Sequence, residues 1–517
     1  MRHLLGHVLI PLLSLVTLPA VAQNIIYEER LPAPVARALK AAGIPQGAVG
    51  VVVQETGAVF PRVSVNAGLT MNPASVMKLL TTFAALELLG PAYTWKTEAL
   101  VAAPPVDGVL AGDLYLKGSG DPKLTLEQFW LLLRQLRARG VREIRGDLVL
   151  DRSAFAAIAH DEAAFDGKPT RPYNVGPDAL LLNFKALRLT LLPDEKRVLV
   201  MSEPAPANLD IINLLKTNGG ACGQGSEWRE ALRADLSRHN GGGNFRLVLT
   251  GNYPSACGEQ RWNIGLLPHP DYVFGVFRQL WTELGGGLTG TVRDGAVPAA
   301  APRLASVESP ALAEIVRDIN KFSNNVMARQ VFLTLARKGG DGEAATGATG
   351  ATGAAGTTGT TGTTGTTGTT GTTGFTGFTT ARADAATRAW LEGRGLRFPE
   401  LVLDNGSGLS RRERISADSM ARLLAAAWKS AVMPELMASL PLTAVDGTLK
   451  KRLRDGGTAG QAHIKTGSLE GVKTMAGYVL DSGGRRQVVV FFVNHANAAA
   501  AQAAQDALLQ WVHDRGI

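Results

Sequence analysis

The chain has 517 residues, of which 45% are hydrophobic and 19% are charged, and its formal net charge is +8. This length exceeds what a single hydrophobic core usually organises, so we expect roughly two or three domains. Lys and Arg are scattered rather than clustered and we find no nucleic-acid-binding motif, which argues against nucleic acid as a partner. The basic balance suits an anionic envelope polymer or membrane surface.

Residues 1–22 have the pattern of a secretory signal peptide. Arg2 precedes an apolar run over 8–16, and Ala20-Val21-Ala22 fits a cleavage site with small residues. Retention of the segment as a membrane anchor is the alternative, but neither this run nor any later stretch reaches about 18 consecutive apolar residues. We therefore expect a mature periplasmic chain that begins near Gln23 and has no transmembrane anchor.

The two ends of the mature chain predict one antiparallel sheet packed with helices. Near the N-terminus, periodicity indicates a helix over 32–43, strands over 47–55 and 59–66, and a helix over 72–89. Near the C-terminus it indicates strands over 461–468, 474–480 and 486–494, and a closing helix over 498–516. We assign residues 23–98 plus 303–517 to this domain.

The block between these ends has a different texture and predicts an insertion that is mainly β. Strand-like pieces such as 112–120 and 146–151 alternate with many turns. We expect residues 99–179 plus 263–302 to form one inserted domain and residues 180–262 to form a smaller domain nested within it. Cys222 and Cys257, the only cysteines, lie in the nested part. In an oxidising compartment we expect a disulfide between them, with two free thiols as the alternative.

Glycine recurs at every third position from Gly347 to Gly377, mostly as Thr-Thr-Gly. Collagen is excluded because these triplets contain no proline. A tract with almost no large apolar side chains cannot form a core, so residues 340–381 predict a flexible loop within the domain formed by residues 23–98 plus 303–517. A surface-binding role for the tract is the alternative.

Ser75 and Lys78 lie three residues apart at the start of the predicted helix over 72–89. That spacing places both side chains on one helix face, and Asn72 and Pro73 suit the first turn. A lysine can take the proton of a serine hydroxyl if burial or another cation lowers its pKa toward neutrality. The pair is therefore a candidate nucleophile and base, although S-x-x-K alone often occurs by chance at ordinary helix starts.

Two later motifs supply the remaining functions of acyl transfer. Ser323-Asn324-Asn325 begins a predicted helix, and Lys465-Thr466-Gly467 lies on a predicted strand. With the first pair, and in this order, they match the S-x-x-K, S-x-N and K-T-G set of penicillin-recognising serine enzymes.

Each motif residue has an expected role. Ser75 would attack, Lys78 would take its proton, and Ser323 could relay that proton to the departing amine. Asn325 would hold a substrate amide. Lys465 would bind a terminal carboxylate, assisted by the neighbouring Thr466, Gly467 and Ser468, and would lower the pKa of Lys78 by repulsion. The backbone N–H groups of Ser75 and Ser468 would form the oxyanion hole.

The chain resembles the class C low-molecular-mass penicillin-binding proteins, which are D-alanyl-D-alanine carboxypeptidases and endopeptidases. The similar segments cover 73–90, 117–122, 319–329, 404–411 and 464–479. The resemblance implies an α+β fold in which a β-lactamase/transpeptidase-like domain is interrupted by nested inserted domains. It also implies peptidoglycan stem peptides and cross-links as substrates, β-lactams as covalent inhibitors, and no cofactor or metal.

The same resemblance implies a subsite for the side chain of the stem peptide. Asp166 and Arg411 are its candidates, and Asp151 competes with Asp166. A structural ion pair between Arg411 and Asp404 is the alternative. Glu470 departs from the family pattern, which can carry a neutral amide there.

Alternative functions are a β-lactamase-like hydrolase or a catalytically idle peptidoglycan-binding scaffold. The large insertion argues against the compact β-lactamases. Residues 285–290 fit G-x-G-x-x-G, but they follow a predicted helix, where glycine serves as a cap, so a dinucleotide site is not expected. Histidine spacing predicts no zinc site. The deacylation base stays open between Lys78 and Ser323, as does the oligomeric state.

Overall fold

The computed structural model describes residues 30–157, 160–195, 197–225, 227–239, 243–338 and 377–515. The predicted signal peptide and residues 340–376 of the predicted Gly/Thr loop lie outside the described residues. The last residues of that predicted loop have defined structure, because Phe378 pairs with Phe155 in a β-bridge and α7 begins at Thr380.

An antiparallel sheet joins the two ends of the chain in the strand order β19-β20-β21-β1-β2. The first and last thirds of the sequence meet where Val49 lies opposite Val493 and Glu55 lies opposite Gln487. Strands β1 and β21 are nearly continuous runs of buried β-branched and aromatic residues, as expected of strands covered on both faces. The strands are β1 (Val49–Glu55), β2 (Val63–Val65), β19 (Ala462–Leu469), β20 (Val472–Leu480) and β21 (Arg486–Asn494).

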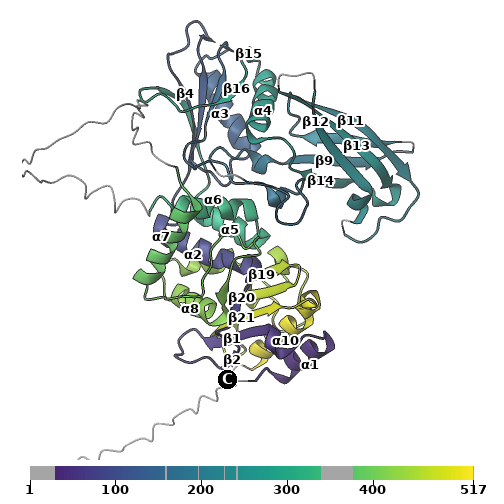
Figure 1. The fold of residues 1–517 in the computed structure, drawn as a ribbon, viewed down its shortest axis with the longest axis vertical. Helices are drawn as coiled ribbons and strands as arrows, with labels where there is room; N and C mark the ends of the chain where they lie inside the picture. Colours follow the sequence, from purple (N-terminus) through teal and green to yellow (C-terminus); the bar gives the residue numbers. More distant parts are fainter. Residues whose placement is uncertain are drawn as a thin grey trace, which may run out of the picture.

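Each face of this sheet is covered by its own set of helices (Figure 1). Alternate residues of β21 point to opposite faces: Val490 and Phe492 pack with α2, α5, α6 and α8, whereas Phe491 and Val493 pack with α1 and α10. The helices are α1 (Ala33–Ala41), α2 (Lys78–Leu89), α5 (Leu312–Phe322), α6 (Asn325–Leu335), α7 (Thr380–Gly393), α8 (Ala417–Trp428), α9 (Met433–Ser439) and α10 (Gln502–Asp514).

A second five-stranded sheet, in the order β16-β8-β6-β4-β17, belongs to the inserted block. It begins at Lys96 and ends at Glu308, so it extends a few residues beyond the predicted 99–302 on both sides. Helices α3 (Leu126–Ala138) and α4 (His269–Glu283) pack with it. Its strands are β4 (Lys96–Val101), β6 (Leu114–Gly118), β8 (Leu148–Asp151), β16 (Val292–Asp294) and β17 (Arg303–Glu308).

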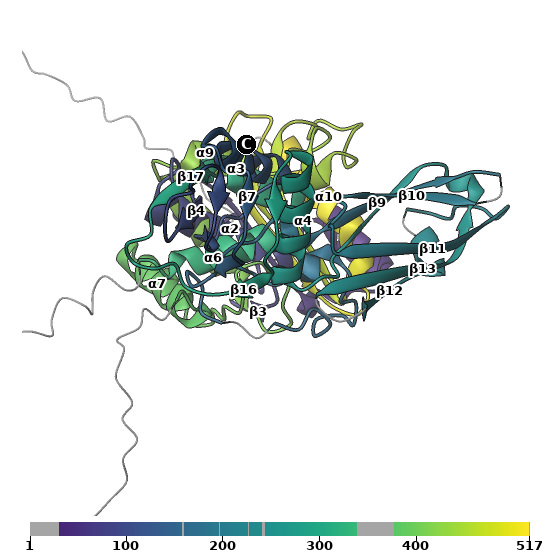
Figure 2. The same cartoon turned by 90° about the horizontal axis from the view of Figure 1, so that it is seen from above.

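The segment predicted as a nested domain contains two three-stranded sheets that project away from the helices that cover the first sheet (Figures 1 and 2). Their orders are β10-β9-β14 and β11-β13-β12. Buried side chains of these sheets, such as Leu189 and Leu249, share one hydrophobic cluster with Phe129 of α3 and Phe277 of α4. The strands are β9 (Leu187–Pro193), β10 (Val198–Glu203), β11 (Leu209–Asn218), β12 (Leu232–His239), β13 (Asn244–Pro254) and β14 (Gln260–Ile264).

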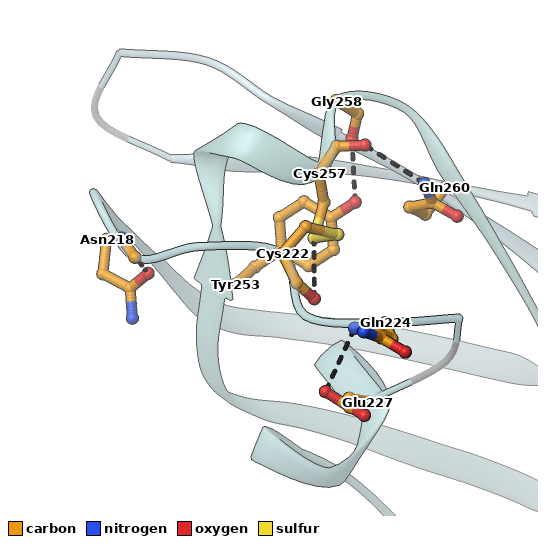
Figure 3. The surroundings of a disulfide bond; sticks show 9 residues. Asn218, Cys222, Gln224, Glu227, Tyr253, Cys257, Gly258 and Gln260 are labelled. Carbon is orange, nitrogen blue, oxygen red and sulfur yellow. Dashed lines mark hydrogen bonds between the residues drawn. A yellow bond between two sulfur atoms is a disulfide. The ribbon is translucent and has the colours of Figure 1, made fainter.

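Cys222 and Cys257 form a disulfide in these sheets (Figure 3). The bond ties the loop after β11 to the turn between β13 and β14. Tyr253 lies beside it and donates a hydrogen bond from its hydroxyl to the carbonyl of Gly258 at 2.8 Å.

Among the helices that the structure describes, none is long and apolar enough to cross a membrane.

Candidate active site

Ser75 lies in a short 3₁₀ helix, η2 (Ala74–Met77), which leads directly into α2. The sequence predicts an α-helix that starts just before Ser75, but the α-helix begins at Lys78. Asn72 accepts a hydrogen bond from the Ala74 N–H at 2.8 Å, and Ala74 itself has the left-handed φ of 46°. Because a 3₁₀ helix has three residues per turn, Ser75 and Lys78 stand one above the other.

Lys78 is fully buried, and its ammonium points at three oxygen atoms. Nζ donates to Ser75 Oγ at 2.9 Å, to Asn325 Oδ1 at 2.6 Å and to the carbonyl of Ser407. Burial, followed by repulsion from Lys465, holds the pKa of Lys78 well below its usual value, although the nearby Glu413 acts in the opposite direction. The lysine is therefore placed for proton exchange with the serine.

The second wall of the site is the tight connection between α5 and α6. Ser323 ends α5 with a left-handed φ of 55°, and Asn324 caps α6 by accepting a hydrogen bond from the Met327 N–H at 3.1 Å. This turn presents Ser323 to Lys465 and Asn325 to Lys78. The strained φ at a non-glycine residue is typical of positions where function decides the backbone conformation.

Strand β19 forms the third wall. Lys465 is fully buried and donates from Nζ to Ser323 Oγ at 2.9 Å and to the Thr466 carbonyl at 2.7 Å. Burial lowers the pKa of Lys465 to about 7. Thr466 Oγ1 lies 2.9 Å from Thr448 Oγ1, and Ser468, near the end of the strand, is exposed. Lys465 thus reaches the cleft through Ser323 rather than as an exposed cation.

Gly467 allows β19 to lie directly against the serine turn. A Cβ atom at this position would stand 2.8 Å from the Ser75 amide nitrogen, 2.9 Å from the Pro73 carbonyl oxygen and 2.3 Å from Thr474 Oγ1. Thr474 also donates to the Pro73 carbonyl at 2.7 Å, which fastens the sheet to the turn. The backbone N–H of Ser75 therefore lies beside the K-T-G strand.

The loop over 404–413 is a fourth component: the sequence marked 404–411 as a family-like segment with Arg411 as a subsite candidate, but the contacts of Ser407 and Glu413 were missed. Its Ser407 carbonyl accepts a hydrogen bond from Lys78, and its Glu413 is fully buried. Gly408 has a φ of +77°, and a Cβ there would stand 1.9 Å from the Ala74 carbonyl oxygen. The two glycines that flank Ser407 were the available signal, since they permit a close backbone approach.

The predicted subsite residues Asp166 and Arg411 have different surroundings. Arg411 donates to the Glu470 carbonyl at 3.0 Å, lies 3.4 Å from the Glu470 carboxylate and stands over the Phe165 ring at 5.0 Å. Asp166 accepts hydrogen bonds from Tyr173 Oη at 2.7 Å and Asn174 Nδ2 at 2.8 Å. Burial opposes but does not cancel these bonds, which hold the pKa of Asp166 below its usual value.

Two alternatives from the sequence do not match the structure. The ion pair between Arg411 and Asp404 is wrong, because Asp404 pairs with the neighbouring Arg412 and Arg411 turns toward Glu470. Asp151 is buried and accepts hydrogen bonds from Ser153 and from the Val297 N–H at 3.0 Å, in a cavity separate from the motif residues.

Two cavities are lined by residues of α6, one at its N-terminus beside Ser323 and one farther along the helix. One has a volume of about 460 Å³ and is lined by Tyr173, Phe322, Ser323 and Asn325 among others. The other has a volume of about 510 Å³ and is lined by Phe165, Arg329 and Arg411 among others. The described residues contain no group of three or more His, Cys, Asp or Glu side chains arranged to hold a metal ion.

Comparison with known proteins decides the family. The model of the D-Ala-D-Ala carboxypeptidase 3 (S13) family matches residues 31–361 and 371–515. The chain belongs to this peptidase family. It is 29% identical over 481 residues to the D-alanyl-D-alanine carboxypeptidase of Actinomadura sp. (strain R39), covering 90% of this chain and 81% of that protein.

Two Haemophilus influenzae comparisons agree with membership of the S13 family. The D-alanyl-D-alanine carboxypeptidase DacB of that organism is 24% identical over 434 residues, covering 83% of this chain and 81% of that protein. The crystal structure of its penicillin-binding protein 4 superposes with a TM-score of 0.71 at 22% identity, covering 93% of this chain and 99% of that chain. The predicted α+β fold and the predicted serine-peptidase class are therefore confirmed.

Proposed function

We propose that this S13 peptidase is a periplasmic DD-peptidase that works through an acyl-enzyme at Ser75. Its substrates are peptidoglycan stem peptides, from which it removes the terminal D-Ala, and the cross-links between them. The observation that carries the proposal is the set of three contacts that link all three motifs. Lys78 contacts Ser75 and Asn325 at 2.9 and 2.6 Å, and Lys465 contacts Ser323 at 2.9 Å.

Acylation begins when Lys78, in its neutral form, accepts the proton of the Ser75 hydroxyl. Oγ then attacks the carbonyl carbon of the penultimate D-Ala, and the developing oxyanion accepts hydrogen bonds from the backbone N–H groups of Ser75 and Ser468. Asn325 orients the substrate amide. The low pKa of Lys78 matters here, because a protonated lysine cannot accept the serine proton.

The proton that Lys78 took passes through the Ser323 hydroxyl to the departing amine, so that Lys78 is neutral again; this hydroxyl lies 2.9 Å from Lys465 Nζ. The C–N bond breaks, and the acyl group remains on Ser75 as an ester. Water then attacks this ester, with Lys78 or Ser323 removing its proton, and Ser75 regains the proton as the product acid leaves. β-Lactams inhibit because Ser75 attacks their strained ring amide, the ring C–N bond breaks, and the opened drug stays on Ser75 as an ester.

The K-T-G strand binds the terminal carboxylate of the substrate. Because Lys465 is buried, the carboxylate contacts the Thr466 and Ser468 hydroxyls, beside Gly467, and interacts with the lysine charge across them. Arg411 stands over the ring of Phe165, the residue that precedes Asp166, and Arg411 and Asp166 bind the acidic and amino ends of the stem-peptide side chain.

Purified muropeptides test the proposal. The wild-type protein should release D-Ala from pentapeptide monomers and convert D-Ala-linked dimers to monomers. In parallel, labelled penicillin should form a long-lived adduct. Rapid penicillin turnover would favour the β-lactamase alternative. The absence of both labelling and cleavage would favour a binding scaffold. Dimers that stay intact would contradict the proposed endopeptidase activity.

Gly467→Ala should slow acylation by penicillin about a hundredfold. The added Cβ forces β19 away from the Ser75 amide, and displacements of about 1 Å in a reacting geometry have effects of this size. The acylation rate is measured as the rate at which labelled penicillin is incorporated into the protein. Gly47→Ala is the matched control, because no atom lies within 4 Å of a Cβ there. Wild-type rates in a folded Gly467→Ala protein would show that close strand contact is unnecessary.

Glu470→Gln should lower the KM for stem peptides that carry a free side-chain carboxylate by about twofold to fivefold. Glu470 competes with that carboxylate for Arg411, and its side chain is 92% exposed, so its ion pair is weak. Peptides whose side-chain carboxylate is amidated are the control and should show no change. An equal KM change for both peptides would contradict a charge effect.

A further inference from the structure

Glu413 is a buried carboxylate with no assigned role in acyl transfer. It has no exposed surface, and its Oε1 accepts backbone hydrogen bonds from Gly406 at 2.8 Å, Asn405 at 3.0 Å and Asp404 at 3.3 Å. Within the described part of the chain, its buried Oε2 has no hydrogen-bond partner. A carboxylate that collects three N–H groups on one oxygen fixes the turn that donates them.

That turn is the one that reaches Lys78. Its Ser407 carbonyl accepts a hydrogen bond from Nζ, and its Gly406 carbonyl accepts one from Thr81 Oγ1 at 2.6 Å. Thr81 lies one helical turn beyond Lys78 on α2. The turn is therefore held from two sides, by Glu413 beneath it and by Thr81 on the helix.

The charged groups around this site come from four elements. Lys78 on α2 and Arg329 on α6 interact with the Glu413 charge, and Asp404 lies within the same loop. Lys465 on β19 acts on Lys78 from the opposite wall. Burial raises the pKa of Glu413, whereas the three backbone amides favour its ionised form. In its ionised form Glu413 is thus the buried negative charge that interacts with Lys78 and Arg329.

We propose that Glu413 is a positioning residue that controls the catalytic Lys78 by holding the Ser407 carbonyl on its Nζ. The same carboxylate counters the positive charges of Lys465 and Arg329, so that Lys78 keeps enough basicity to take the serine proton. This inference rests on the proposed function, in which Lys78 is the base for Ser75.

Glu413→Gln separates the charge from the shape, since an amide oxygen can still accept the three N–H bonds. The Glu413 charge raises the pKa of Lys78, so its removal lowers that pKa further. The acid limb of the rate of penicillin acylation against pH should therefore move to lower pH by about one unit. A purely structural role would lower the rate at every pH and leave the limb in place.

Thr81→Val tests the positioning part and keeps the charge. It removes the second anchor of the turn in a nearly isosteric side chain, and the plateau rate should fall about tenfold with the acid limb unmoved. Asp481→Asn is the matched control for Glu413→Gln. Asp481 is also a buried carboxylate and accepts a hydrogen bond from the Arg485 N–H at 2.8 Å, but it lies at the far end of β20. Its substitution should change neither the plateau rate nor the acid limb.

Formation of the penicillin adduct by the wild-type protein tests the proposed function alone. The differences in acylation rate and acid limb between the variants and the wild type test the role of Glu413. A folded Glu413→Gln protein with an unshifted acid limb would overturn the charge role. A folded Thr81→Val protein with the wild-type plateau would overturn the positioning role, and this variant decides the question if Glu413→Gln does not fold.

Discussion

The Ser75→Ala protein is expected to fold normally, yet to form no penicillin adduct and to lose at least about a thousandfold of its peptidase rate. The substitution removes one oxygen atom, and Lys78 keeps its hydrogen bonds to Asn325 and Ser407. No replacement nucleophile occupies the same turn. The measurement is intact-protein mass after incubation with penicillin, combined with release of D-Ala from pentapeptides.

Ser153→Ala is the matched control for this experiment. Ser153 is exposed in the inserted block and bonds to Asp151 at 2.6 Å, so its loss should leave acylation unchanged. Covalent labelling of a folded Ser75→Ala protein would assign the nucleophile elsewhere and would contradict the mechanism.

Lys78→Met is the second substitution with a large expected effect. Acylation should fall by about a hundredfold to ten-thousandfold, the usual contribution of a positioned base. The protein should remain folded and should melt no lower than about the wild-type temperature, because the main effect of the site on Lys78 is the desolvation of its charge. Penicillin incorporation and thermal melting measure the two halves of the prediction.

The lowered pKa of Lys78 also predicts how the rate of acylation should change with pH. Burial and Lys465 lower the pKa of Lys78, so the neutral amine is present at lower pH than for a free lysine. The wild-type acylation rate should rise as pH increases through that lowered pKa, and the residual rate of Lys78→Met should lack this rise. Lys40→Met, at an exposed position on α1, is the control. A variant that acylates with the wild-type pH profile would exclude Lys78 as the base.

The sequence predicts most of the central sheet well because four of its strands are long and two of them, β1 and β21, consist largely of apolar residues. Strands β1 and β19 to β21 match the predicted ranges closely. The predicted strand over 59–66 is shorter, since Val59 and Phe60 are 82% and 64% exposed and only Val63–Val65 pairs with β1. An apolar residue in a sequence does not reveal whether its side chain is buried until the register of its strand with the neighbouring strand is known.

The three motifs could be predicted because each lies within a few consecutive residues, and their order along the chain identified them as one set. The contribution of the loop over 404–413 could not be predicted. Glu413 stands in the polar run Ser410-Arg411-Arg412-Glu413-Arg414, which reads as solvated surface. Its burial depends on amide groups as far as nine residues earlier in the chain, in a turn shaped by glycine. The partner of Arg411 was mispredicted for the same reason, since Glu470 is 59 residues away.

Pairing of the first and last strands also has a consequence for how the molecule is made. Ser75 is synthesised early, but Lys465 and the strand beside it arrive almost 400 residues later, after the whole insertion. β2 can pair with one edge of β1 at once, but the other edge of this apolar strand has no partner in an emerging chain until residues 486–494 are available. Such long-range closure is slow and exposes a strand edge. A chain that ends short of β19 therefore contains the serine and the lysine of the first motif but has no hydrolytic machinery.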